Sequence, residues 1–214
     1  MKKLQPYSGL WLFLALLLSS CGEQVLAPAD YVNWMKDPVN GHVRTKTIAP
    51  LEVIAQYKTT DFVIANEKRS NTIEKSAHEV RQEELEGMHY WTLQLSINDP
   101  AIKTKGAKAW NILNYGIEDK SQEQERLMYF SYAMQRDLKL IEGQDTLACA
   151  LYHFERSYDL SKTRTFVLGF PKGKDQTTDK TLLLDLPYFN TGPIKINYPK
   201  TVLDQAPRMR LEDG

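Results

Sequence analysis

Apolar and polar side chains alternate along several short stretches of this chain, most clearly over residues 88–97. There Trp91, Leu93 and Leu95 fall on one face, whereas Gln94 falls on the other. This period of two is typical of a strand with one buried face. The same signals predict further strands at residues 51–57, 146–158, 165–170, 181–186, 188–189 and 194–198.

Residues 125–141 carry two conflicting signals. Their leucine and methionine side chains are spaced as on a helix, but the aromatic run of residues 128–132 favours a strand. We predict a strand, because residues 142–145 (Glu-Gly-Gln-Asp) resemble a hairpin turn that leads into the next strand.

Helical spacing is strongest in two segments. Asp30 can cap a short helix that carries Tyr31 and Trp34 on one face. Further on, Asn71-Thr72-Ile73-Glu74 resembles a capping box, and apolar residues then recur at helical spacing as far as Leu85. Both helices should therefore bury one narrow apolar face.

The order of these elements favours an antiparallel fold. Strand follows strand through turn signals, without the regular alternation of strands and helices that produces a parallel sheet. We predict a mainly β fold, an antiparallel β-sandwich with one or two attached short helices, in a single domain at residues 30–200. A short helix is also expected at residues 108–115, and residues 201–214 should form a polar tail.

The first residues have the composition of a secretory signal. Lys2 and Lys3 precede an apolar run at residues 10–18, and the small residues Ser19 and Ser20 follow it. A membrane-spanning helix needs about 20 apolar residues, so this run is too short to cross a bilayer. We expect residues 1–20 to be a signal peptide that is removed from the mature chain.

Leu18-Ser19-Ser20-Cys21 resembles the lipobox of bacterial lipoproteins. In that family the cysteine sulfur carries a diacylglycerol, a peptidase cuts just before it, and the new amino end often receives a fatty acid such as palmitate. The resemblance implies cleavage between Ser20 and Cys21, a lipidated tether at residues 21–29, and no cofactor besides the lipid on Cys21. Because one acyl chain binds a membrane only marginally, the two or three chains implied here would make the attachment stable.

A second resemblance covers the mature chain. Tyr31-Val32-Asn33-Trp34, Asp37-Pro38-Val39-Asn40-Gly41 and Gln56-Tyr57-Lys58 are similar to segments of small lipoproteins of Bacteroidetes-type bacteria. This resemblance implies an envelope location and no particular activity. Gly22 stands where an aspartate marks inner-membrane retention in other bacteria, which favours the outer membrane and leaves the periplasmic or surface side open.

Charge and cysteine content narrow the range of partners. The chain has 27 basic and 27 acidic side chains, and the signal peptide removes Lys2 and Lys3. The slightly acidic mature chain argues against nucleic acid as a partner, because phosphate binding needs a basic excess. Once Cys21 is lipidated, Cys149 has no disulfide partner within the chain. Its small and apolar neighbours predict a buried, inert thiol.

Two groups of side chains are candidates for a binding site, although no enzyme motif is present. His153 and Glu155 would share one face of a strand, where they could bind a metal or orient a proton-transferring histidine. A histidine hydrogen-bonded at the core edge is the alternative, and without a third ligand we predict no metal site. Tyr129 and Tyr132 could stack on sugars or anchor a protein if exposed, or could pack in the core.

Three functions remain open. The first is a non-enzymatic binding or structural module of an outer-membrane assembly, attached to the membrane by its lipid and bound to a protein partner in the envelope. The second is a carbohydrate-binding accessory protein that holds a glycan on exposed aromatic rings. The third is a hydrolase or metal enzyme that uses His153 and Glu155.

Overall fold

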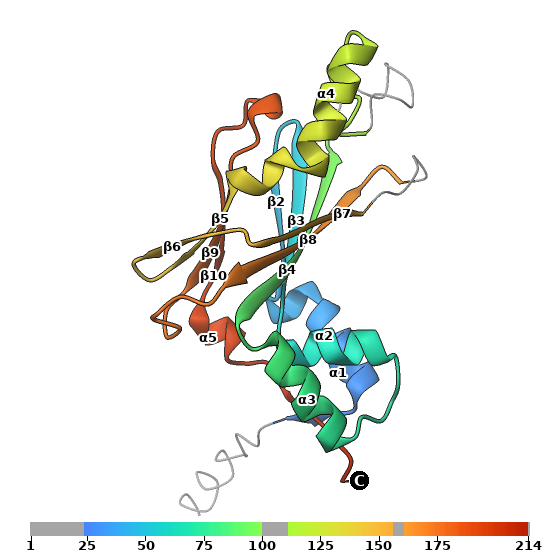
Figure 1. Ribbon diagram of the computed structural model, residues 1–214, viewed down its shortest axis with the longest axis vertical. Helices are drawn as coiled ribbons and strands as arrows, with labels where there is room; N and C mark the ends of the chain where they lie inside the picture. The colour runs from blue at the N-terminus through green and yellow to red at the C-terminus, as the bar shows by residue number, and fades with distance from the viewer. Residues whose placement is uncertain (1–23, 100–110, 156–160, 214) are drawn as a thin grey trace, which may run out of the picture.

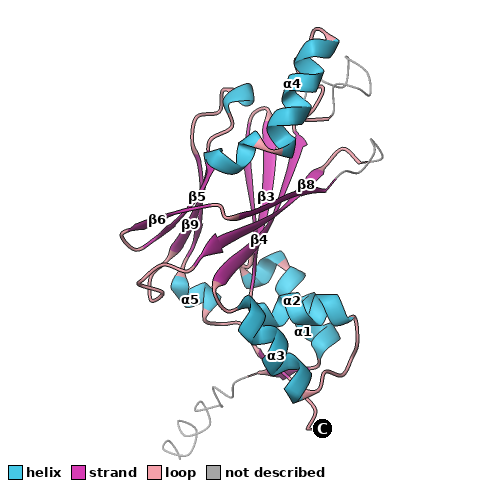
Figure 2. Cartoon of the chain, viewed as in Figure 1, coloured by secondary structure: helices cyan, strands magenta, loops and turns pink. Residues whose placement is uncertain are grey.

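The computed structural model describes residues 24–99, 111–155 and 161–213. Two antiparallel sheets occupy the middle of the molecule, and helices lie at both ends of its long axis (Figures 1 and 2). The predicted signal peptide and Cys21 lie outside the described residues. In the part of the chain that is described, no helix combines the length and the apolar composition needed to cross a membrane.

The larger sheet has five strands in the order β2-β3-β4-β8-β7. Along the sequence these strands are β2 (Val43–Ile48), β3 (Leu51–Lys58), β4 (Met88–Ile97), β7 (Leu151–Glu155) and β8 (Arg164–Pro171). The predicted strands at 51–57, 88–97 and 165–170 are confirmed as β3, β4 and β8. β7 pairs only with β8, so it forms one edge of the sheet as described.

The second sheet has four strands in the order β10-β9-β5-β6. These strands are β5 (Leu138–Glu142), β6 (Asp145–Ala148), β9 (Lys180–Leu184) and β10 (Ile194–Tyr198). The predicted hairpin turn is confirmed, because Glu142 lies opposite Asp145 and Gly143 has a positive φ of 59°. The predicted strand at 146–158 is instead divided between β6 and β7, which belong to different sheets.

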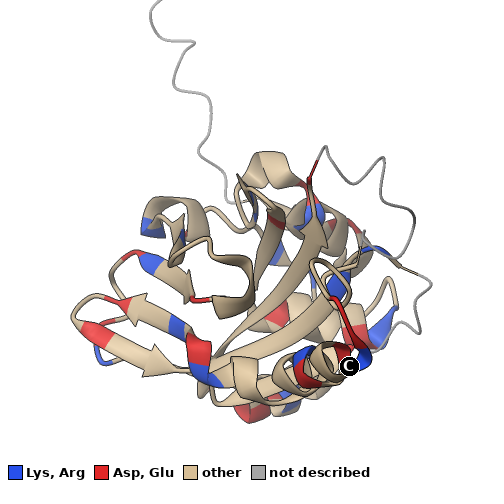
Figure 3. Ribbon diagram, turned by 90° about the horizontal axis from the view of Figure 1, so that it is seen from above, with Lys and Arg blue, Asp and Glu red and all other residues tan. Residues whose placement is uncertain are grey.

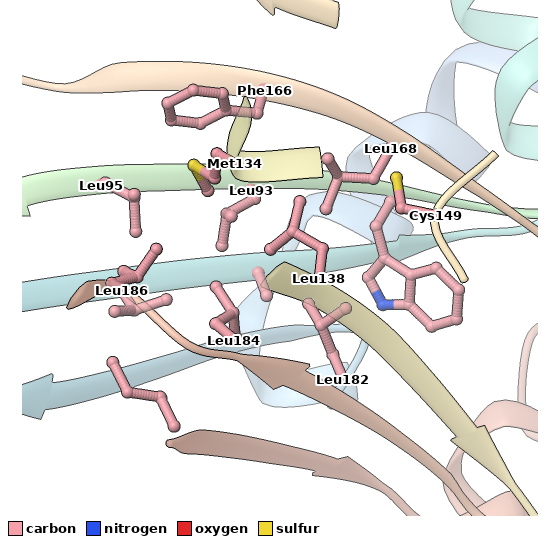
Figure 4. Close-up of a cluster of buried hydrophobic side chains, with 14 of the residues drawn as sticks. Leu93, Leu95, Met134, Leu138, Cys149, Phe166, Leu168, Leu182, Leu184 and Leu186 are labelled. Carbon is pink, nitrogen blue, oxygen red and sulfur yellow. The ribbon is translucent and has the colours of Figure 1, made fainter. Parts of the chain in front are cut away.

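One apolar core joins the two sheets. Side chains of the five-stranded sheet point toward those of the four-stranded sheet, and Met134 and Leu186 close the space between them (Figure 4). The labelled strand residues in this core are Leu93, Leu95, Phe166 and Leu168 on one side and Leu138, Leu182 and Leu184 on the other. The alternation along the strands thus places these apolar faces against each other.

A second cluster of buried residues holds three helices together at one end of the molecule. The helices are α1 (Pro28–Lys36), α2 (Thr60–Lys68) and α3 (Lys75–Leu85). A short parallel pair, β1 (Val25–Leu26) and β11 (Arg208–Met209), packs against them through Leu26 and Met209. The segment expected to be a polar tail therefore includes β11 and most of the short helix α5 (Lys200–Leu203).

The predicted caps of two helices are wrong. α1 begins at Pro28 after Ala27, so Asp30 lies within its first turn rather than at its cap. α3 begins at Lys75 after Glu74, and no side chain caps it. Proline is well placed at the first position of a helix because its φ is already helical and the missing N–H has no helical partner there.

The strand predicted at 125–141 is wrong for most of its length. α4 (Lys120–Ser131) and a 3₁₀ turn, η5 (Ala133–Asp137), occupy this region, and only β5 is extended. Asp119 caps α4 by accepting a hydrogen bond from the Gln122 N–H at 2.9 Å. Tyr129 and Phe130 lie on the buried side of α4, so these aromatic residues pack one face of a helix into the core.

These elements make the fold mixed α and β rather than mainly β. The described residues contain α1 to α5 together with the two antiparallel sheets, which is more helix than one or two short attachments. Tyr188 and Phe189, expected in a strand, lie in a 3₁₀ turn, η6 (Pro187–Phe189). Another 3₁₀ turn, η2 (Pro38–Asn40), precedes β2. Of the helix expected at 108–115, residues 111–115 form a bend and turns, and the rest lies outside the described residues.

Candidate functional site

A pocket opens at the edge of the five-stranded sheet, beside β7. It has a volume of about 330 Å³ and is formed by the end of α4, by η5 and by three consecutive residues of β7. We call it the edge pocket, and its lining residues are Ser131, Tyr132, Gln135, Tyr152, His153 and Phe154. Consecutive residues of β7, which alternate between the two faces of the strand, take part because the pocket lies at the strand's edge.

Hydrogen bonds hold the walls of the edge pocket in place. The Tyr152 hydroxyl donates to the carbonyl of Phe130, which ties β7 to the last turn of α4. The Gln135 side-chain amide donates to the carbonyl of Cys149 at 2.9 Å, which ties η5 to the chain just before β7. The pocket is therefore built on secondary structure elements that are fixed to one another.

Two of the four side chains predicted for binding line this pocket together. His153 is exposed on the outer face of β7, and Tyr132 is 64% exposed at the end of α4. Glu155 is exposed on the same face of β7 but is not part of the lining. Tyr129 is buried, and its hydroxyl donates to Asp137 Oδ2 at 2.8 Å, so its ring presents no binding face.

The chemistry of the edge pocket suits binding. The hydroxyl oxygen of Ser131 is buried in the wall without a hydrogen-bond partner, and the rings of Tyr132 and His153 supply flat surfaces. Met128 is 58% exposed one helical turn before Tyr132, which adds apolar area on the same face of α4. A ligand could therefore combine a polar group with an apolar or planar surface.

Metal binding and thiol chemistry are two further possibilities for the described part of the chain. Within residues 24–99, 111–155 and 161–213, no group of three or more His, Cys, Asp or Glu side chains could hold a metal ion. The predicted burial of Cys149 is confirmed by its 6% exposure. Burial raises the pKa of the Cys149 thiol to about 11, which keeps it protonated at neutral pH.

Away from the edge pocket, a buried ionic cluster joins the two sheets. Glu142 of β5 accepts hydrogen bonds from Lys180 Nζ at 2.6 Å and from the backbone N–H of Gly173 at 2.7 Å. His89 of β4 places Nε2 3.1 Å from Glu142 Oε1. We call His89, Glu142 and Lys180 the Glu142 cluster, and their exposures are 4%, 0% and 5%.

Burial and charge set the protonation states in this cluster. Burial lowers the pKa of His89 to about 4, and the positive charge of Lys180 adds to this effect. Burial alone would raise the pKa of Glu142, but the hydrogen bonds from Lys180 and Gly173 hold it below its usual value. At neutral pH the cluster is an ion pair with a neutral histidine that donates from Nε2. Donors within the protein occupy both oxygens of the Glu142 carboxylate. We therefore interpret the cluster as a structural contact that helps to hold the two sheets together.

Sequence reasoning missed the Glu142 cluster, although a signal was present. Glu142 follows Leu138 and Leu140 at the buried parity of β5, and Lys180 precedes Leu182 and Leu184 at the buried parity of β9. Opposite charges on two buried faces indicate an internal ion pair, because unpaired buried charges are too costly.

Comparisons with known proteins leave the family open. No protein-family model and no curated protein sequence matches this chain. Among solved structures, one described as "a putative lipoprotein from Staphylococcus aureus subsp. aureus NCTC 8325" matches with a TM-score of 0.29 and 8% sequence identity. The match covers 80% of this chain and 99% of the other. Similarity at this level does not establish a common fold.

Proposed function

We propose that this protein is a lipid-anchored protein of the bacterial cell envelope whose body is a non-enzymatic binding or structural module. The observation that carries this proposal is Cys21, which directly follows Leu18-Ser19-Ser20 at the end of a short apolar signal. The absence of Asp after Cys21 favours the outer membrane as its location. In this proposal the two facing sheets form a sandwich-like body at the end of a short lipidated tether.

We place binding of a protein partner at the edge pocket. Support comes from the exposed Tyr132 and Met128, since aromatic and methionine side chains are enriched at protein interfaces. Among the described strands β7 pairs with β8 alone, so an extended partner segment could hydrogen-bond to its outer edge. The walls are fixed by hydrogen bonds, so a partner would meet a preformed surface.

Replacing the lipidated sulfur tests the anchor. The Cys21→Ser protein should leave the membrane fraction and lose incorporation of a labelled fatty acid, because a serine hydroxyl cannot form the thioether. A Cys149→Ser protein is the matched control and should remain in the membrane fraction, since Cys149 is buried in the body. Equal membrane retention of the Cys21→Ser protein would refute the proposal.

Site-specific photocrosslinking tests the partner site. A photoreactive residue at position 132 in intact envelopes should give a discrete crosslinked protein. The same residue at position 39 is the control, because Val39 is 89% exposed on η2, away from the edge pocket. Identical crosslinks at both positions, or none at position 132, would contradict binding at this pocket.

Carbohydrate binding is the second candidate function, and the exposed ring of Tyr132 beside a polar pocket favours it. A flat tyrosine face can pack on the apolar side of a sugar. Binding of the detergent-extracted protein to a glycan array, abolished by Tyr132→Ala and kept by Val39→Ala, would support this function over protein binding.

A further inference from the structure

The described chain is fixed to the fold from its first residue. The carbonyl of Gln24 accepts a hydrogen bond from the Arg208 N–H at 2.8 Å, and the carbonyl of Leu26 accepts one from the Arg210 N–H at 2.7 Å. Leu26 and Met209 then pack into the helical cluster. β1 is thus attached to the body both by backbone hydrogen bonds and by apolar contacts.

Very little chain separates this fixed point from the proposed lipid. Only Gly22 and Glu23 stand between Cys21 and Gln24. Three steps of 3.8 Å between successive Cα atoms give a span of at most about 11 Å, whatever the conformation. A lipid on Cys21 would therefore hold β1 close to the membrane surface.

The outer face of this end has the chemistry of a headgroup contact. Val25 is 48% exposed and lies opposite Arg208 in the parallel pair, while Leu26 and Met209 occupy the inner face. Arg208 and Arg210 are both exposed, and because they are two residues apart they share this outer face. An apolar side chain flanked by two guanidinium groups suits a surface of lipid phosphates.

Other charges near this end are mixed in sign. The backbones of Glu74 and Glu212 form a parallel β-bridge, and the N–H of Lys75 donates to the carbonyl of Glu212 at 2.9 Å. Across the view of Figure 3 basic and acidic residues are likewise interspersed. Charge alone therefore does not select a membrane face, and the short link to Cys21 supplies the decisive restraint.

We infer that Val25, Arg208 and Arg210 define an anchor face that rests against lipid headgroups, so that α4 is directed away from the membrane. This inference depends on the proposed lipidation of Cys21. The C-terminal end of the chain and α3 lie at one end of the long axis and α4 lies at the other (Figure 1). A lipid attached next to β1 would then orient the body as well as retain it.

Fluorescence quenching in vesicles tests this orientation. Full-length lipidated proteins carrying Val25→Cys at the anchor face or Glu123→Cys in the first turn of α4 would be labelled with a fluorophore. They would be reconstituted into phosphatidylethanolamine–phosphatidylglycerol vesicles that contain lipids with a nitroxide on the headgroup. We expect at least several-fold stronger quenching at position 25 than at position 123.

A lengthened tether is the matched control. A Gly/Ser insert of about 12 residues after Gly22 has a root-mean-square span of roughly 20 Å, which would release the anchor face without removing the lipid. Quenching at position 25 should then fall, while the protein still floats with the vesicles. Arg208→Glu with Arg210→Glu should reduce the quenching at position 25 in the same direction.

The outcomes separate the anchor from the orientation. A protein that floats with the vesicles and is quenched equally at positions 25 and 123, or more strongly at 123, overturns the orientation while the anchor stands. A protein that does not float shows that the lipid is missing, and the proposed anchor and the orientation then fail together.

Discussion

At the scale of single residues, buried charged side chains add to the apolar core in holding the two sheets together. Glu142 has no exposed surface, yet it accepts from Lys180, from Gly173 and from His89. Removing one partner from such a cluster leaves a buried charge without compensation, which is far more destabilising than the net value of the intact pair. The parity of Glu142 and Lys180 could be read from the sequence. Their pairing could not, because it depends on which strands become neighbours.

His89 makes stability depend on pH in the mildly acidic range. An unfolded histidine has a pKa near 6.5, whereas burial lowers the pKa of His89 to about 4. Between these values the unfolded chain binds a proton that the folded protein does not, so the free energy of unfolding falls as the pH drops from 6.5 toward 4. At about 1.4 kcal/mol per pKa unit, the total loss is on the order of 3 kcal/mol.

Urea unfolding of the wild-type and His89→Gln proteins at neutral pH and at about pH 5 measures this effect. The glutamine amide can still donate to Glu142 but does not titrate, so the variant should lose less stability on acidification. Burial also lowers the pKa of His42, which adds the same sign of pH dependence to both proteins. An identical pH dependence in the two proteins would show that His89 is not responsible.

At the scale of elements, hydrophobic alternation predicted the long central strands and failed where aromatic residues belong to a helix. β3 and β4 have an uninterrupted period of two and were predicted almost to the residue. α4 was missed because the aromatic content of residues 128–132 favours a strand, and the cap at Asp119 was not recognised. Two of the four predicted binding residues lie on or next to α4. Tyr132 lines the edge pocket from the end of the helix, whereas Tyr129 faces the core.

The cap of α4 gives a test at this scale. Asp119→Ala removes the acceptor for the Gln122 N–H, so the free energy of unfolding should fall by about 1 kcal/mol. Asp119→Asn keeps an acceptor at the cap and should leave stability nearly unchanged. Thermal and urea unfolding measure both variants, and an equal loss in the two would assign the effect to the charge rather than to the cap.

At the scale of the whole molecule, the two ends of the described chain meet. Val25 and Leu26 pair with Arg208 and Met209, and this pair packs on α1, α2 and α3. No local pattern could have predicted the contact, because two-residue strands carry little sequence signal and their partners are separated by nearly the entire chain. The same helices contribute to the mixed α and β character of the fold. No helix was predicted at the residues of α2.

The proposed function depends on the covalent state of Cys21. Mass spectrometry of the amino-terminal peptide of the protein isolated from native membranes measures it directly. We predict a peptide that begins at Cys21 and carries a diacylglycerol, with or without an additional fatty acid on its amino group. A peptide that begins at another residue, or an unmodified Cys21, would contradict the lipid anchor and the orientation inferred from it.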